Sequence, residues 1–180
     1  VAQLLDRMEQ RDRFSGVVYV VRDGVPIVER ACGAADKSCD CPNTLETRFN
    51  LGSITKMFTA VAVAQLVESG QIRFDSPVST YAPAFLAPPK DQVAIHHLLS
   101  HTSGIPECVT PALIPNRSAY RNTDDYLPLF VDEPLLFAPG ERWAYSNSNY
   151  LLLGYIIEKV TGQSYKDYMQ THVFTPAGLA

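Results

Sequence analysis

A helix that is apolar on nearly every side, predicted over Ser53–Glu68, is the strongest constraint on how this chain can fold. Apolar side chains between Met57 and Val67 cover most of the helix circumference, and Gly70 follows as a stop signal. Helices of this kind are buried in the core of their domain. We therefore expect Ser53 to lie in the first turn of a central, buried helix, where a polar and nucleophilic side chain needs an explanation.

Lys56 follows Ser53 by three residues, so that the hydroxyl and the amine share one helix face within contact distance. A serine hydroxyl needs a neighbouring base or cation to become a nucleophile. Burial and the positive end of the helix would both favour a neutral amine, which could then accept the serine proton. The same helix start would offer the Ser53 backbone N–H to a developing oxyanion. The alternative is a capping serine followed by a surface lysine, and the spacing alone does not decide between them.

A second cluster, Tyr145-Ser-Asn147, stands just ahead of another predicted helix. A phenol close to Lys56 could pass a proton to a leaving group, and an amide could both donate and accept hydrogen bonds. Taken alone, the pattern is more typical of an aromatic loop in which Asn147 caps the helix. The cluster is a candidate for function only together with the first one.

The remaining elements are unevenly distributed along the chain. The first 13 residues have helical apolar spacing, and two β-rich runs surround Asp23-Gly24, a strong hairpin signal. Loops are predicted over Gly33–Asn50 and Asp75–Pro89, and helices over Ile95–His101, Thr123–Val131, Asn149–Val160 and Ser164–Val173. Because an isolated hairpin is marginally stable, we predict an α+β domain whose remaining strands lie beyond Ala180.

Composition argues against two classes of partner. The chain carries a formal net charge of −4 with scattered Lys and Arg, so we expect no nucleic-acid surface. No apolar stretch approaches the roughly 18 residues that span a bilayer. The chain begins at Val1 rather than at Met, which indicates processing or truncation, and a removed signal peptide is compatible with that start.

The four cysteines leave two possibilities open. Cys39 and Cys41 are expected to be too close for an easy mutual disulfide, whereas Cys32 could reach either of them across the intervening loop. Free or partly buried thiols, with Cys108 among them, are an equal alternative. No C-x-x-C pair of the kind that favours zinc occurs.

His97 and His101 stand four residues apart on a predicted helix, a spacing that can hold zinc. The glutamate of the H-E-x-x-H motif is missing, because Leu98 stands in its place. We therefore expect no metal and no other cofactor. Trp143 and Tyr150 flank the second cluster, and we expect them to fill core rather than to line a substrate cleft.

Taken together, these segments resemble the serine β-lactamase and penicillin-binding-protein superfamily. The nearest branch holds class C β-lactamases, D-alanyl-D-alanine peptidases and family VIII esterases. The resemblance rests on the opening hairpin, Thr47-Arg-Phe-Asn-Leu-Gly-Ser-Ile-Thr-Lys56, His97-Leu-Leu-Ser-His-Thr-Ser-Gly-Ile-Pro106, Phe137-Ala-Pro-Gly-Glu-Arg-Trp-Ala-Tyr-Ser-Asn147 and the helix with Leu153, Gly154 and Gly162. It covers nearly the whole chain.

The resemblance implies a β-lactamase/transpeptidase-like fold, with a helical region packed on an antiparallel sheet that is incomplete in this chain. It implies that Ser53 is acylated, that Lys56 assists, and that Tyr145 and the substrate-binding Asn147 complete the site. The reaction would be acyl transfer to Ser53 followed by hydrolysis, with β-lactam, D-amino-acid peptide or ester substrates. It also makes His101-Thr-Ser-Gly a structural turn, and by family habit it favours a periplasmic or secreted location.

One departure from the family pattern bears on activity. The family's third element, a Lys/His-Thr/Ser-Gly triplet on a later strand, has no match after Asn147, because Val160-Thr-Gly162 ends a helix. In the family that strand supplies the second oxyanion N–H. We therefore expect residues 1–180 to be a partial serine hydrolase domain that is inactive alone. It would pair with its missing C-terminal half or self-associate through an open sheet edge.

Three other functions are alternatives to a serine hydrolase of this family. An α/β-hydrolase is disfavoured because no G-x-S-x-G occurs in the chain. A metal-dependent hydrolase rests only on the histidine pair. The serious alternative is a non-catalytic penicillin-binding or sensor protein that keeps the pocket without turnover.

Overall fold

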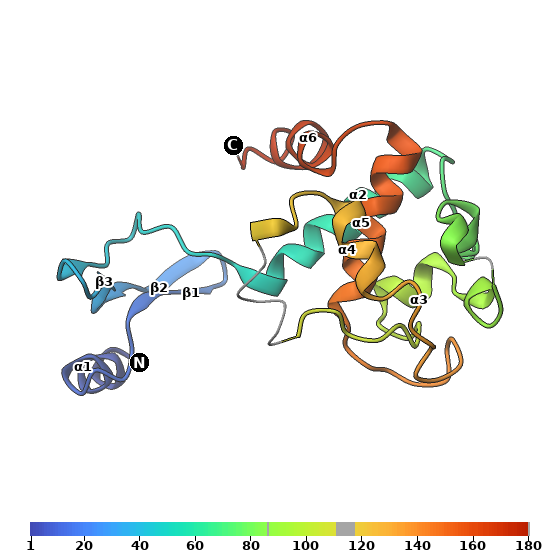
Figure 1. Cartoon of the computed structure of the whole chain (residues 1–180). Coiled ribbons are helices and arrows are strands. Elements are labelled where there is room, and N and C mark those ends of the chain that lie inside the picture. Colours follow the sequence, from blue (N-terminus) through green and yellow to red (C-terminus); the bar gives the residue numbers. More distant parts are fainter. Residues whose placement is uncertain (86, 111–117, 180) are drawn as a thin grey trace. The chain divides into compact units, whose positions relative to one another are not determined.

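The computed structural model describes residues 1–85, 87–110 and 118–179, which divide into two compact units, Val1–Gly52 and Ser53–Ala180. The first unit contains α1 (Ala2–Gln10), β1 (Gly16–Arg22), β2 (Val25–Cys32), β3 (Ala34–Asp36) and β4 (Cys41–Pro42). The named elements of the second unit are all helices, joined by long irregular segments (Figure 1). The prediction of one partial domain over residues 1–180 stays a prediction.

The N-terminal helix and the hairpin form as predicted. β1 pairs antiparallel with β2 from Gly16 opposite Cys32 to Arg22 opposite Val25, with an irregularity after Val20. Arg30 of β2 holds α1 in place, because its guanidinium lies 2.5 Å from Asp6 and 3.2 Å from Glu9. Leu5 is the buried residue of α1. The attachment of α1 to the hairpin thus combines a buried apolar side chain, Leu5, with the ion pairs of Arg30.

The segment predicted as loop after Gly33 contains a second small sheet, which corrects that prediction. β3 pairs antiparallel with β4, and Cys39 and Cys41 form a disulfide with a Cα–Cα distance of 5.2 Å. Asp40 between them has a φ of 52°, which turns the chain back and brings the two Cα atoms within disulfide range. The expectation that these cysteines are too close to pair was wrong, while Cys32 and Cys108 are free and buried.

The helical unit begins with a 3-10 turn, Gly52–Thr55, that continues into α2 (Lys56–Glu68). The α-helices that follow among the described residues are α3 (Ile95–Leu99), α4 (Thr123–Tyr126), α5 (Asn147–Thr161) and α6 (Tyr165–Tyr168). Short 3-10 turns occupy Val78–Thr80, Pro83–Phe85, Lys90–Gln92 and Leu127–Leu129, and a π-helical segment, Met169–Phe174, extends α6. Pro128 explains why the helix predicted over Thr123–Val131 is shorter than expected, since proline interrupts helical hydrogen bonding.

The hydrophobic core lies in the helical unit, around the packed pair α2 and α5 (Figure 1). Fully buried side chains from α2 include Val63 and Leu66, and those from α5 include Leu153 and Ile157. Phe85 and Phe130 close the core, with ring centroids 6.4 Å apart. Because the facing sides of α2 and α5 are packed without exposure to water, the distance between the first turns of these two helices is fixed.

Burial of α2 is one-sided, which corrects the prediction of a helix buried all round. Only Thr59, Ala62, Val63 and Leu66 of this helix are buried. On the opposite side Ile54, Met57 and Val61 are 61%, 57% and 45% exposed, at helical spacing. We call these three residues the exposed α2 face. The sequence of the helix thus provides two apolar faces, and one of them is covered by the second unit's core.

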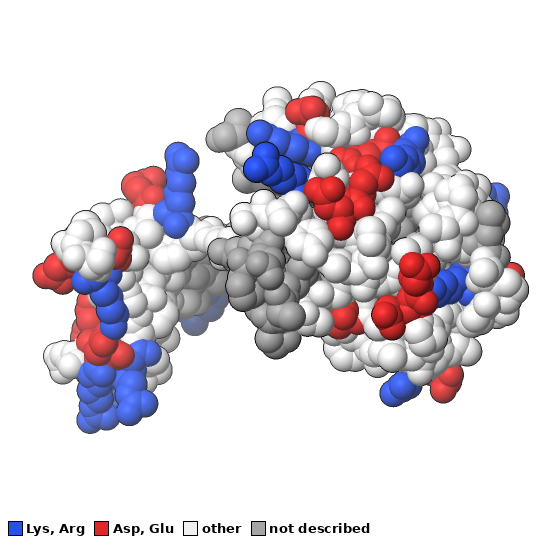
Figure 2. All heavy atoms as spheres, viewed as in Figure 1, with Lys and Arg blue, Asp and Glu red and all other residues white. Residues whose placement is uncertain are grey.

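No helix among the described residues is both long and apolar enough to cross a membrane. Figure 2 shows acidic and basic side chains interspersed on the viewed surface of each unit.

Replacing Gly104 by Ala is expected to destabilise the helical unit by about 3 kcal/mol or more. Gly104 has a φ of 78°, and a Cβ there would lie 2.2 Å from the backbone oxygen of Phe137. A backbone atom cannot rotate away as the end of a side chain can, so the clash would require the main chain to shift. The free energy of unfolding, measured in urea, checks this.

Gly162→Ala is the matched control. Gly162 ends α5 with a φ of 68° and open space around a Cβ, so only the left-handed backbone is penalised, by about 1 kcal/mol. Equal losses in the two variants would contradict the close contact at Gly104.

Candidate active site

Ser53 lies in the 3-10 turn before α2, and its side chain is exposed rather than buried. Its Oγ is 2.7 Å from the Tyr145 phenol oxygen and 3.0 Å from Lys56 Nζ. The hydroxyl therefore contacts both the amine and the phenol, and we find no role for it as a capping group. The capping alternative for Ser53 does not describe this turn.

Lys56, the first residue of α2, is half-buried and lies at the centre of the group. Its Nζ donates to the Asn147 side-chain oxygen over 2.7 Å. It also lies 5.1 Å and 5.6 Å from the ring centroids of Tyr145 and Tyr150, within cation–π range. Tyr145 in turn donates to the Asn147 oxygen over 3.2 Å. The structure thus brings together all four residues that the sequence predicted for the site.

The first turn of α5 places Asn147. Ser146 precedes the helix as its N-cap residue, but its hydroxyl donates to the Pro106 carbonyl and accepts no capping hydrogen bond from the first turn of α5. Asn147 is the first helical residue, and its side chain turns toward Lys56 rather than capping α5. Ala144 N donates to the His101 carbonyl over 2.9 Å, so the segment that leads into α5 is attached to the 101–107 turn.

The environment of Tyr145 lowers the pKa of its phenol. Burial raises that pKa, but hydrogen bonds from Lys56 and Ser53 and the positive charge of Lys56 together outweigh it, while the charge of Glu107 opposes them. A phenol with a lowered pKa gives up its proton more readily and is better suited to proton transfer.

His101 supports the phenol from behind. Its ring centroid lies 4.6 Å from that of Tyr145 and 5.3 Å from that of Tyr150. Its Nδ1 lies 3.3 Å from Ser146 N, which can only donate, so Nδ1 is the acceptor and the neutral ring carries its proton on Nε2. This arrangement fits the predicted structural turn.

Two further predictions can be compared with the structure. Trp143 is 65% exposed and touches His101 only edge-on, so the expectation that it fills core was wrong. Tyr150 is half-buried and packs against the core as expected, but it also lines the cavity beside Lys56 and Asn147. His97 accepts a hydrogen bond from Ala94 N at the start of α3. Within the described part of the chain, no three His, Cys, Asp or Glu side chains are grouped as a metal site would require.

Glu107 is the site residue that sequence reasoning missed. Its Oε2 accepts hydrogen bonds from the backbone and side-chain amides of Asn147, over 2.8 Å and 3.0 Å. It directly follows the His97–Pro106 motif, and that proximity is the signal that could have singled it out. Its role depends on how the turn folds back on α5, which no local pattern predicts.

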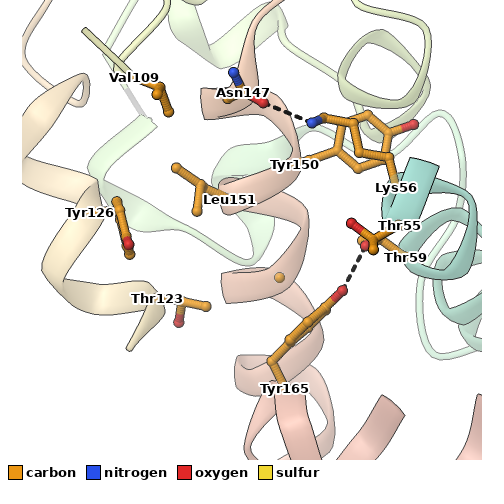
Figure 3. Close-up of a pocket in the computed structure, with 11 residues that line it drawn as sticks. Thr55, Lys56, Thr59, Val109, Thr123, Tyr126, Asn147, Tyr150, Leu151 and Tyr165 are labelled. Atoms are coloured by element: carbon orange, nitrogen blue, oxygen red, sulfur yellow. Dashed lines mark hydrogen bonds between the residues drawn. The ribbon is translucent and has the colours of Figure 1, made fainter. Parts of the chain in front are cut away.

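A cavity of about 310 Å³ opens beside Lys56 and Asn147 (Figure 3). Its lining residues come from α2, α4 and α5, with Thr55 from the 3-10 turn before α2, Val109 from the loop before α4 and Tyr165 from the start of α6. Ser53 and Tyr145 do not line it. The cavity therefore adjoins the amine and the amide of the site and offers space next to the nucleophile rather than over it.

Comparison with solved structures defines the class of fold. A penicillin-binding protein from Bacillus halodurans aligns with a TM-score of 0.81 and 35% identity, over 97% of this chain and 55% of that one. With its helices and small antiparallel sheet, the chain has a β-lactamase/transpeptidase-like fold.

The chain belongs to the beta-lactamase family, whose family model matches residues 1–180. It is 33% identical to penicillin-binding protein 4* of Bacillus subtilis, over 98% of this chain and 39% of that protein. It is also 33% identical to esterase EstB of Burkholderia gladioli, over 96% of this chain and 47% of that protein. The chain thus spans less than half the length of these two relatives. Its family is one of serine hydrolases.

We expect the free energy of unfolding to decrease as the pH falls below about 6.5, the ordinary pKa of histidine. Burial, followed by the charge of Lys56, lowers the pKa of His101, against the smaller opposing effects of the Ser146 backbone hydrogen bond and of Glu107. The unfolded chain therefore binds more protons than the folded one at acid pH. The stability contributed by neutral His101 is present above the unfolded-state pKa and is lost as the pH falls through the folded-state pKa.

Urea unfolding across this pH range checks the prediction. His101 has a φ of 57°, which Asn tolerates, so His101→Asn should flatten the pH dependence without straining the backbone. Part of the dependence remains, because burial also lowers the pKa of His97. His172→Gln, in the C-terminal π-helical segment, is the control. An identical pH dependence in His101→Asn and the parent chain would count against this role.

Proposed function

We propose that this chain carries the nucleophile of a serine hydrolase that works through an acyl-enzyme on Ser53. The observation that supports it best is the position of the Ser53 hydroxyl, in hydrogen-bond contact with both Lys56 Nζ and the Tyr145 phenol. A nucleophile and its proton acceptors within such reach are the geometric requirement for covalent catalysis. The family relationship makes this arrangement of residues more than a surface coincidence.

In the proposed reaction, Ser53 Oγ attacks the substrate carbonyl carbon and its proton passes to the Lys56–Tyr145 pair. The carbonyl π electrons move onto oxygen and form the tetrahedral oxyanion. When the oxyanion collapses, the bond to the leaving group breaks, and Tyr145 delivers the proton to that group. Water then attacks the acyl carbon of the Ser53 ester, and the same pair accepts the water proton. The bond between that carbon and Ser53 Oγ breaks, the proton returns to Oγ, and the carboxylic acid leaves. Asn147 holds Lys56 by its side-chain oxygen and faces the cavity where the acyl portion would bind.

The substrates we propose are compounds that can transfer an acyl group to a serine: β-lactams, D-amino-acid peptides or esters. The named relatives include penicillin-binding proteins and an esterase, and a D-stereospecific amidohydrolase from Streptomyces is a further structural neighbour, with 30% identity and a TM-score of 0.65. All of these substrates share the same attack on a carbonyl, so the Ser53 group serves each of them.

We further propose that the exposed α2 face is covered by strands from a C-terminal portion of the parent protein. Ile54, Met57 and Val61 form one apolar row that begins beside Ser53. A strand on that face would also bring the second oxyanion donor to the nucleophile. Loss of one such donor reduces the rate by about a hundred- to a thousand-fold, so residues 1–180 alone would turn over poorly.

A fluorophosphonate or β-lactam probe is expected to label Ser53, as detected by the mass increase of the intact protein and of its Ser53 peptide. Ser53→Ala should abolish labelling. Lys56→Met and Tyr145→Phe should slow it by about a hundred-fold or more, because each removes a proton acceptor. Labelling of another residue, or equal labelling of Ser53→Ala, would contradict the assignment.

Turnover distinguishes the enzyme from a binding protein. The longer parent protein should hydrolyse a chromogenic β-lactam or a short-chain ester, and residues 1–180 should not do so at normal enzyme rates. Stable labelling of the longer protein without hydrolysis would favour the non-catalytic alternative. Normal turnover by the 180-residue chain would disprove its inactivity.

Val61→Lys is expected to change the free energy of unfolding differently in the 180-residue chain and in the longer parent protein. In residues 1–180 this exposed position should tolerate the charge within about 0.5 kcal/mol. In the longer protein, if strands cover the face, the unpaired charge should reduce the free energy of unfolding by about 3 kcal/mol or more. Val63→Lys is the control. Val63 is fully buried, so this substitution should destabilise both proteins. Equal tolerance of Val61→Lys in both proteins would mean that the face stays open.

A further inference from the structure

The Glu107 carboxylate is fully engaged by three N–H donors. Oε2 accepts from Asn147 N and Asn147 Nδ2, and Oε1 accepts from Val109 N over 2.6 Å. The side chain is half-buried, so these bonds are not exchanged freely for water. A carboxylate held from both sides in this way has little freedom to rotate.

The same bonds determine which way the Asn147 amide faces. An amide has an accepting end and a donating end, and the two are not interchangeable in a hydrogen-bond network. With Nδ2 held by Glu107, Oδ1 must face Lys56 and Tyr145, from which it accepts hydrogen bonds over 2.7 Å and 3.2 Å. Rotation of the amide would place Nδ2 against the Lys56 amine and leave Glu107 opposite an oxygen.

We propose that Glu107 is a positioning residue of the Ser53 site and acts by fixing the Asn147 amide. This inference rests on the proposed function. An accepting oxygen at Asn147 engages one N–H of Lys56. The same Nζ lies 3.0 Å from Ser53 Oγ, so the bond to Asn147 holds the amine within hydrogen-bond distance of the nucleophile. Glu107 therefore selects the orientation of the amine without touching it, and the described residues place no carboxylate within 4.0 Å of Lys56.

Electrostatics favour the same orientation. The Asn147 amide lies between the Glu107 carboxylate at its N–H₂ end and the Lys56 amine at its oxygen. Both neighbours polarise the amide in the same direction, and hydrogen bonds in such a chain strengthen one another. Glu107 also sits at the N-terminus of α5, where the helix dipole stabilises a negative charge.

The competing explanation is that Glu107 only stabilises the start of α5. Asn147 N is the first backbone amide of that helix, and a carboxylate there contributes to stability whatever the side chain at 147 is. The two roles differ in one respect, because only positioning requires the Asn147 side chain. A double-mutant cycle between the two residues therefore separates them.

The experiment measures the second-order rate constant for fluorophosphonate labelling of Ser53. The proteins compared are the unsubstituted 180-residue chain, called the parent chain here, and its variants Glu107→Ala, Asn147→Ala and the double variant. We expect Glu107→Ala to slow labelling by about 10- to 100-fold, the effect of a misplaced group near the reacting atoms. The double variant should be within about threefold of Asn147→Ala. If the two losses multiply instead, Glu107 does not act through Asn147 and the proposal is wrong.

Glu107→Gln tests orientation separately from charge. Its oxygen can still accept from Asn147, so it should recover most of the labelling rate, within about tenfold of the parent chain. A Gln variant as slow as Glu107→Ala would overturn the orientation mechanism. Asp125→Ala is the matched control for a lost capping carboxylate. Asp125 is also half-buried, and its Oδ2 accepts from two backbone amides, Arg121 N and Asn122 N, at the start of α4. This control should lower stability without slowing labelling.

A readout that needs no reactivity keeps the inference distinct from the proposed function. The Asn147 side-chain N–H₂, observed by ¹⁵N NMR, should exchange slowly with solvent in the parent chain and in Asp125→Ala, and rapidly in Glu107→Ala. Persistent protection in Glu107→Ala would overturn the positioning role whatever the labelling shows. If Ser53 is not labelled in the parent chain, the proposed function fails, and the amide signal still decides the role of Glu107.

Discussion

The hydrogen bond between Lys56 Nζ and the Asn147 side-chain oxygen is the interaction on which the site depends. It joins the first residue of α2 to the first residue of α5, 91 residues apart in sequence, over 2.7 Å. Below it, Val63 and Leu153 belong to the same dry core, so apolar packing fixes the separation of the two helices. The polar contact then orients what the packing has brought close. Neither one alone would place the Ser53 hydroxyl between an amine and a phenol.

A group of polar side chains at the edge of a core is stable only when its donors and acceptors match. Here each link has a direction: Lys56 and Tyr145 donate to the Asn147 oxygen, and the Asn147 amide donates to Glu107. His101 packs against Tyr145 and accepts from the backbone just before α5. The left-handed turn that contains Gly104 supplies both His101 and Glu107. The turn is therefore part of the site's support, although it is remote from the nucleophile in sequence.

The parts of this structure that the sequence predicts are those governed by local rules. Asp23-Gly24 predicts the hairpin, and the spacing of Ser53 and Lys56 predicts their contact because one helical turn separates them. The approach of Asn147 to Lys56 is a tertiary contact, which only the family resemblance suggested. Glu107 had no local signature at all, since its partners are determined by how the 101–107 turn meets α5. The Cys39–Cys41 pairing was missed because it depends on the left-handed backbone of Asp40.

The two apolar faces of α2 connect the stability of the fold to the chemistry of the site. One face is buried against α5, and the other, Ile54, Met57 and Val61, begins in the same turn as Ser53. Any element that covers the exposed α2 face must end beside the nucleophile, because the row of apolar side chains leads there. Apolar burial along the row would then position whatever backbone groups that element presents to Ser53. Under the proposed function, the hydrophobic contact between the added strands and the exposed α2 face would also bring their backbone N–H groups to Ser53.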